Sequence, residues 1–143
     1  MTNESIFLWP VRIYYEDTDS GGVVYYANYL KFMERARTEW LRSLGFEQDT
    51  LIRDAAIIFA VRSVEVDYLR PARFNEALTV SAEVAASGGA SITFRQEVRR
   101  GDEVLCRGKV KIASLDAQTL RPKPAPAELL AALGQNITSP QGA

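Results

Sequence analysis

Most of the chain alternates between apolar and polar residues with the two-residue period of a β-strand. The first such stretch places large apolar or aromatic side chains at odd positions: Phe7, Trp9, Val11, Ile13 and Tyr15. Four more follow at residues 64–68, 78–84, 92–98 and 104–112. Short glycine-containing turns at 87–89 and 100–102 separate the last three, so we expect these three strands to be antiparallel neighbours.

One segment follows a helical period instead. Between Ala27 and Leu44 a stripe recurs at spacings of three and four: Leu30, Met33, Ala36, Arg37, Trp40, Leu41 and Leu44. Gly45 is a natural stop for this helix. At 1.5 Å per residue, a helix of about 17 residues is roughly 25 Å long. A shorter helix is expected at 48–55.

The order of elements is therefore a strand, a long helix and about four antiparallel strands. A single helix must bury its apolar stripe, and one sheet wrapped around it is the economical solution. Residues 55–61 are apolar on both faces, which predicts a strand buried at a subunit contact and hence a homo-oligomer. Three prolines end the sheet region, and 127–133 forms a last helical turn or two. We expect one α+β domain over 1–135 and a loose tail at 136–143.

Composition narrows the possible functions. Seventeen Lys and Arg residues against eighteen Asp and Glu leave a net charge of −1, which gives no reason to bind nucleic acid. Neither a secretory signal nor an apolar stretch of the roughly 20 residues that span a bilayer is present, which predicts a cytoplasmic protein without membrane insertion. Histidine is absent and Cys106 is the only cysteine, so Ser-His-Asp and Cys-His catalysis and zinc sites are excluded. We expect Cys106 to be a small core residue.

The candidate chemistry lies in the segment directly before the long helix. Glu16, Asp17 and Asp19 precede the pair Gly21-Gly22. On composition alone, a turn followed by helix capping is the favoured interpretation, because Asp, Ser and Gly prefer turns. A calcium loop would match Asp17, Asp19 and Gly22 at its positions 1, 3 and 6, but its position 12 is Asn28 rather than a bidentate Glu. No metal or cofactor is therefore predicted.

This segment also resembles the signature of a known family. YYEDTDSGGVVYYANYLKFMERARTEWL resembles the signature of the Tol–Pal-associated acyl-CoA thioesterases, in the 4-hydroxybenzoyl-CoA thioesterase group of the hotdog fold. VDYLRPARFNEALTV and GGASITFRQEV extend the resemblance over nearly the whole chain. It implies a five-stranded antiparallel sheet wrapped around one long helix, and a dimer with the sheets side by side, often a homotetramer. It also implies that Asp19 is catalytic and that the backbone N–H of Tyr26 activates the thioester carbonyl.

Thioester chemistry suits a chain without histidine. The leaving thiol resembles Cys, with a pKa near 8.5, so its expulsion needs little acid assistance. The reaction requires a carboxylate, as base or nucleophile, and N–H groups aimed at the oxyanion. We expect Gly22, Val23 and Tyr25 to contact substrate, and a Cβ at Gly22 to crowd the path between Asp19 and the helix amides. Relatives often carry His at position 26, and only the backbone donor survives its replacement by Tyr.

The carrier of the acyl group is CoA or an acyl carrier protein. In the 4-hydroxybenzoyl-CoA branch, as the resemblance implies, basic residues on the turn before strand 91–98 hold the nucleotide phosphates. Here that turn, 87–90, is uncharged and leads into Ser91, a candidate substrate contact; Arg70 and Arg73 are the nearest cations. A non-catalytic acyl-thioester or carrier-protein scaffold is the alternative function, whereas hotdog dehydratases need a histidine.

Charged residues on the helix are expected to be structural. Glu34, Arg35, Arg37 and Glu39 belong to the family pattern. Arg35 and Glu39 are four residues apart, so they are expected to pair on the helix surface.

Overall fold

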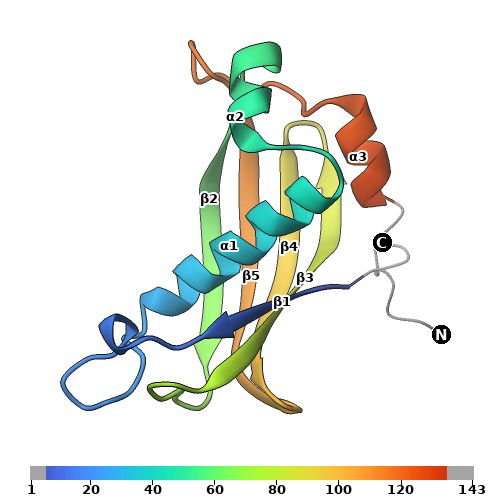
Figure 1. The fold of residues 1–143 in the computed structure, drawn as a ribbon. Coiled ribbons are helices and arrows are strands. Elements are labelled where there is room, and N and C mark those ends of the chain that lie inside the picture. The colour runs from blue at the N-terminus through green and yellow to red at the C-terminus, as the bar shows by residue number, and fades with distance from the viewer. Residues whose placement is uncertain (1–5, 135–143) are drawn as a thin grey trace.

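A computed structural model describes residues 6–134 as one helix-and-sheet unit (Figure 1). Its elements are, in order, β1 (Phe7–Arg12), a 3-10 turn (Tyr15–Asp17), α1 (Asn28–Ser43), α2 (Gln48–Thr50) continued by a π-type turn (Leu51–Ala55), β2 (Ile57–Tyr68), β3 (Ala77–Gly88), β4 (Ser91–Arg100), β5 (Glu103–Asp116) and α3 (Ala127–Gly134). The predicted tail at 136–143 lies outside the described residues. No helix within 6–134 is long and apolar enough to cross a membrane.

The five strands form one antiparallel sheet in the order β1-β3-β4-β5-β2. Tight turns join β3 to β4 and β4 to β5, where Gly89 (φ 56°) and Gly101 (φ 61°) take the left-handed conformation. The strands β1 and β2 are the two edges. The expected fold class, with its antiparallel sheet and single long helix, is confirmed.

The helix α1 lies across one face of the sheet (Figure 1). Alternate side chains of β3, β4 and β5 turn toward it and are buried. The fully buried Met33 sits over Gly108 of β5, where an added Cβ would come within 2.9 Å of the Met33 sulfur. Burying a side chain of this size stabilises the fold by about 1.5–3 kcal/mol. The glycine therefore makes room for the helix.

Three details of the pattern were wrong. Tyr15 does not continue β1: it is 77% exposed in the 3-10 turn, because the chain leaves the sheet after Arg12. Leu105 is fully buried, whereas the expected Val104 is only partly so, because the β4–β5 register shifts between Val98 and Arg99. On α1, Tyr29 and Phe32 are buried, and Leu30 and Leu44 only partly.

The edge strand β2 pairs with β5 along one side only, among the residues that the structure describes. Its register shifts between Val61 and Ser63. Val61, Val64 and Tyr68 are exposed apolar or aromatic side chains on this edge, with Val61 at 54%. A long edge strand with exposed apolar side chains is a template for pairing with another chain.

Candidate active site

The segment between the 3-10 turn and α1 is closed on itself by backbone hydrogen bonds. Thr18 and Val24 form an antiparallel bridge, and the Asp19 N–H donates to the Val23 carbonyl at 2.9 Å. The Gly22 N–H donates to the Asp19 carbonyl at 3.0 Å. Gly22 has φ 82°, a conformation that residues with a Cβ rarely adopt. The position of Asp19 is thus set by main-chain geometry.

The Asp19 carboxylate lies at the exposed rim of this loop. Its Oδ1 accepts a hydrogen bond from the Gly21 N–H at 2.8 Å, while Oδ2 has no donor among residues 6–134. A Cβ on Gly21 would lie 3.3 Å from Oδ1. A Cβ on Gly22, by contrast, meets no described protein atom within 4 Å, so the expected crowding of the substrate path there stays a prediction. Gly21 is the glycine that leaves room for the carboxylate, a role that the sequence pair did not reveal.

The neighbouring Asp17 holds the loop against α1. Its Oδ2 accepts the Tyr14 N–H at 2.8 Å, and its carbonyl accepts both the Tyr25 N–H at 3.0 Å and Asn28 Nδ2 at 2.9 Å. These contacts join the start and the end of the loop to the first residue of the helix. Asp17 supports the site structurally.

Backbone donors face outward where the loop meets α1. The Asn28 N–H donates to the Tyr25 carbonyl at 2.8 Å, but the N–H groups of Tyr26 and Ala27 have no acceptor in the described part of the chain. The first amides of a helix carry the positive end of its dipole. Tyr26 and Ala27 directly precede α1, so their two donors lie next to this positive end and can bind an oxyanion.

Tyrosine rings from this segment, from α1 and from β2 contact one another. The ring of Tyr26 lies 4.9 Å from Tyr25 and 5.8 Å from Tyr68, and Tyr68 lies 5.7 Å from Tyr29. A hydrogen bond with the Tyr26 side chain raises the pKa of Tyr25. Tyr29 is buried and accepts the Ala72 N–H on its hydroxyl at 3.0 Å, whereas Tyr25 and Tyr26 are exposed. Tyr29 therefore belongs to the core, and Tyr25 and Tyr26 form a wall beside the donors.

The predicted cations and Ser91 are placed differently. Arg73 forms a bridge with Val23, which puts it beside the Asp19 loop, and its guanidinium has no acceptor among the described residues. Arg70 Nε pairs with Glu103 Oε2 at 3.1 Å. Ser91 begins β4 at the end of the sheet away from this loop (Figure 1). Within one chain, Asp19, Gly22, Val23, Tyr25, Tyr26 and Arg73 come together, and Ser91 does not join them.

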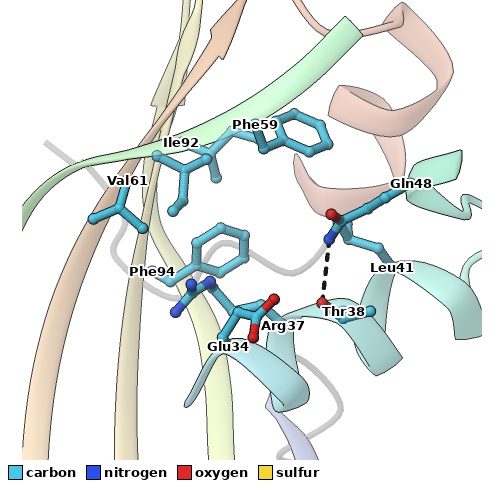
Figure 2. Close-up of a pocket in the computed structure, with 10 residues that line it drawn as sticks. Glu34, Arg37, Thr38, Leu41, Gln48, Phe59, Val61, Ile92 and Phe94 are labelled. Atoms are coloured by element: carbon cyan, nitrogen blue, oxygen red, sulfur yellow. Dashed lines mark hydrogen bonds between the residues drawn. The ribbon is translucent and has the colours of Figure 1, made fainter. Parts of the chain in front are cut away.

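A cavity of about 290 Å³ lies farther along α1, between the helix and the strands β2, β4 and β5. Figure 2 shows Glu34, Arg37 and Thr38 of α1 across from Phe59 and Val61 of β2. Arg37 donates to Oε1 of the fully buried Gln96 at 3.0 Å. The alternation of β4 places position 96 on the inward face, which is the signal that could have found Gln96.

The charged pair expected on α1 was wrong. Glu39 pairs with Arg42 at 2.6 Å, and Arg35 lies 6.0 Å above the ring of Phe32. The core role of Cys106 is confirmed, because its side chain is fully buried, and this burial raises the pKa of its thiol to about 12. Among residues 6–134, no three His, Cys, Asp or Glu side chains are grouped so as to hold a metal.

A model of the thioesterase superfamily matches residues 21–107, which include the glycine pair, α1 and most of the sheet. The chain belongs to this superfamily. One relative is the "Acyl-CoA thioesterase YbgC" of Haemophilus influenzae, which is 45% identical and covers 88% of this chain and 93% of the relative. Another is the "Acyl-CoA thioester hydrolase YbgC" of Escherichia coli O6:H1, which is 39% identical and covers 93% of this chain and 99% of the relative. The predicted resemblance is confirmed.

Solved structures agree with this assignment. A probable thioesterase from Bartonella henselae superposes on this thioesterase with a TM-score of 0.81 at 34% identity, covering 85% of this chain and 99% of the other. A 1,4-dihydroxy-2-naphthoyl-CoA thioesterase from Synechocystis, at 20% identity, shows the same fold with a TM-score of 0.84, covering 90% and 96%. The architecture of this superfamily member is the hotdog fold.

Proposed function

We propose that Asp19 is the essential carboxylate of this acyl-CoA thioesterase and that the backbone N–H of Tyr26 binds the oxyanion. The proposal rests on the presence of a carboxylate and of free backbone amides on one loop. A carboxylate with an oxygen, and two amides, that have no partner in residues 6–134 are held together by the bonds from Asp17, Thr18 and Val23. Thioester hydrolysis needs these two groups, a base or nucleophile and oxyanion donors.

The chemistry needs no further acid. The thioester carbonyl binds with its oxygen toward the amide donors, which stabilise the negative charge that develops there. Asp19 either takes a proton from an attacking water or attacks the carbonyl carbon itself and forms an anhydride. In both routes the thiolate leaves without a protonated partner, because its pKa is close to 8.5.

Hydrolysis across a series of acyl-CoA chain lengths, with free thiol as the readout, tests the proposal. Release of thiol distinguishes an enzyme from an acyl-thioester scaffold, which would bind the same substrates without turnover. A single turnover in ¹⁸O-labelled water then separates the two routes. Direct attack of water places ¹⁸O in the product acid, whereas an anhydride opened at Asp19 leaves the first product acid unlabelled.

The acyl carrier is the second part of the proposal. The uncharged turn before Ser91 and the pairing of Arg70 with Glu103 leave Arg73 as the cation beside the loop. We therefore expect recognition to rest on the pantetheine arm and the acyl group, so that acyl-CoA and acyl carrier protein both serve as substrates. A cytoplasmic location and an association with Tol–Pal proteins remain predictions from the sequence.

A side-by-side homodimer through β2 is the third part. The strand is long, open on one side within the described chain, and carries Val61, Val64 and Tyr68 exposed on its edge. Pairing of two such edges would bury these side chains and fill the open hydrogen-bond positions. Sedimentation should show a dimer or a tetramer (a dimer of dimers) for the natural chain, and Val64→Asp should shift it toward the monomer.

A further inference from the structure

The cavity beside the second half of α1 is mainly apolar. Phe59, Ile92 and Phe94 form its wall on the strands, and Leu41 contributes from the helix. At one side, Gln48 Nε2 donates to Thr38 Oγ1 at 3.2 Å, so this polar pair satisfies itself (Figure 2). An apolar pocket of about 300 Å³ or more with a few placed polar groups is the usual form of a small-ligand site.

Arg37 is the buried charge in this cavity. It is 8% exposed and is held by a single side-chain hydrogen bond, from Nη1 to Gln96 Oε1. The orientation of Gln96 is itself determined, because its Nε2 donates to the carbonyls of Met33 at 3.0 Å and Ser81 at 3.3 Å. A guanidinium has five N–H donors. Arg37 uses one of them on Gln96 and finds no other acceptor within residues 6–134.

No carboxylate in residues 6–134 comes within 4.0 Å of the Arg37 guanidinium. Glu34, one turn earlier, attracts it electrostatically but is exposed at the mouth of the cavity. Burial lowers the pKa of Arg37. By contrast, Arg100 pairs with both Glu76 and Glu103 at 2.8 Å. A buried charge without a counter-ion costs several kcal/mol, and a bound carboxylate would offset this cost through paired N–H···O bonds.

We propose that this cavity binds the far end of the acyl group and that Arg37 selects acyl groups ending in a carboxylate. The preferred substrates would then be half-thioesters of short dicarboxylic acids. This inference rests on the thioesterase function proposed above and adds a substrate class to it. The size of the cavity, about 290 Å³, suits a short acyl chain.

The position of Arg37 along α1 determines which catalytic loop a bound acyl group can reach. Arg37 follows Asn28 by nine residues (37 − 28), which is about 14 Å along a helix. A short acyl group held at Arg37 is therefore far from the Asp19 loop of the same chain. The cavity adjoins β2 through Phe59 and Val61, so the acyl group enters from the loop of a second copy across the proposed β2 contact.

Matched substrates test the inference without any mutation. Glutaryl-CoA and pentanoyl-CoA have the same number of carbons and differ at the far end, carboxylate against methyl. For the natural protein we expect kcat/KM to favour glutaryl-CoA at least tenfold, which is about 1.4 kcal/mol. Equal rates, or a preference for pentanoyl-CoA, would overturn the proposal whatever the variants do.

Three variants then assign the preference to Arg37. Arg37→Met keeps the length of the side chain and should reverse the preference, and Arg37→Lys should keep part of it. Arg35→Met removes an exposed charge two residues away and should change neither rate. A tenfold preference that survives in folded Arg37→Met would reject the role of Arg37. Glutarate should raise the melting temperature of the natural protein but not that of Arg37→Met.

Two other results are informative. If the natural protein shows no preference and Arg37→Met weakens self-association, the guanidinium pairs with a carboxylate of a second copy, and the proposal is wrong. Asp19-dependent hydrolysis of pentanoyl-CoA would leave the proposed function standing in that case. The absence of hydrolysis for every acyl-CoA would reject the proposed function itself.

Discussion

The loop before α1 and the second half of α1 handle charge in opposite ways. Before the first turn of α1, the Asp19 carboxylate is exposed and accepts the Gly21 N–H, while the Asp19 backbone bonds to Gly22 and Val23. In its second half, the Arg37 guanidinium is buried and is positioned by the side chain of Gln96. The Asp19 carboxylate is open to solvent, whereas the Arg37 guanidinium is largely removed from it.

The difference shows how a small domain separates reaction from recognition. An exposed carboxylate requires no large desolvation energy during folding, so its position can be left to a loop of glycines. A buried guanidinium needs hydrogen bonds and surrounding side chains during folding, and it then binds a partner more strongly in its low-dielectric site. Variants at Asp19 should therefore lose turnover, whereas variants at Gln96 should lose stability.

The largest effect is expected from Asp19→Asn. The amide keeps an acceptor for the Gly21 N–H but loses the charge, so kcat should fall by at least ~100-fold, the scale of a lost general base. The melting temperature should stay close to that of the natural protein, because the side chain is exposed. Glu16→Gln removes a nearby exposed charge and serves as the control. Turnover close to the natural rate in Asp19→Asn would contradict the mechanism.

At the buried end, Gln96→Leu should lower stability rather than turnover of methyl-ended substrates. It leaves the Arg37 guanidinium without its acceptor and removes the Nε2 donor to the carbonyls of Met33 and Ser81, at a cost of about 2–3 kcal/mol of unfolding free energy. The double variant Gln96→Leu/Arg37→Met removes both polar partners and should regain much of the loss. Urea unfolding measures both values. Additive losses in the double variant would show that the two side chains are not coupled.

The glycine pair offers a smaller test within the loop. Gly21→Ala brings a Cβ to 3.3 Å from Asp19 Oδ1 and should lower kcat/KM by about tenfold through displacement of the carboxylate. Gly22→Ala meets open space but must adopt φ 82°, so it should lose about 1–2 kcal/mol of stability. Kinetics and thermal melts on both variants separate these causes. Equal activity losses at both positions would argue against a specific role of Gly21.

The smallest effect concerns the nucleotide of CoA. Acyl-pantetheine should be hydrolysed within about tenfold of acyl-CoA, since few cations face the loop. Arg73→Ala should raise the KM for acyl-CoA a few-fold, whereas Arg70→Ala, whose charge already pairs with Glu103, should leave it unchanged. A hundredfold rise in KM on removal of the nucleotide would reveal a phosphate clamp elsewhere.

Local patterns predicted the elements well because each reports on its own neighbours. The alternation of β3, β4 and β5 and the stop at Gly45 follow from burial and from φ at single positions. The errors arose where a distant segment intervened. Tyr15 left the sheet because the chain turned to build the loop, and Leu105 became buried through a register shift against Val98. Neither event has a local signature.

The sequence by itself determined the fold class, the absence of histidine chemistry and the segment that carries Asp19, because these depend on residue types and their spacing. Only the tertiary structure decided which groups are free to act. Within residues 6–134, it left the amides of Tyr26 and Ala27 without acceptors and gave Arg37 a neutral partner instead of a carboxylate. Hydrogen-bond partners and burial come from segments far apart in the chain: Gln96 lies 59 residues from Arg37. Spacing along the sequence does not encode such contacts.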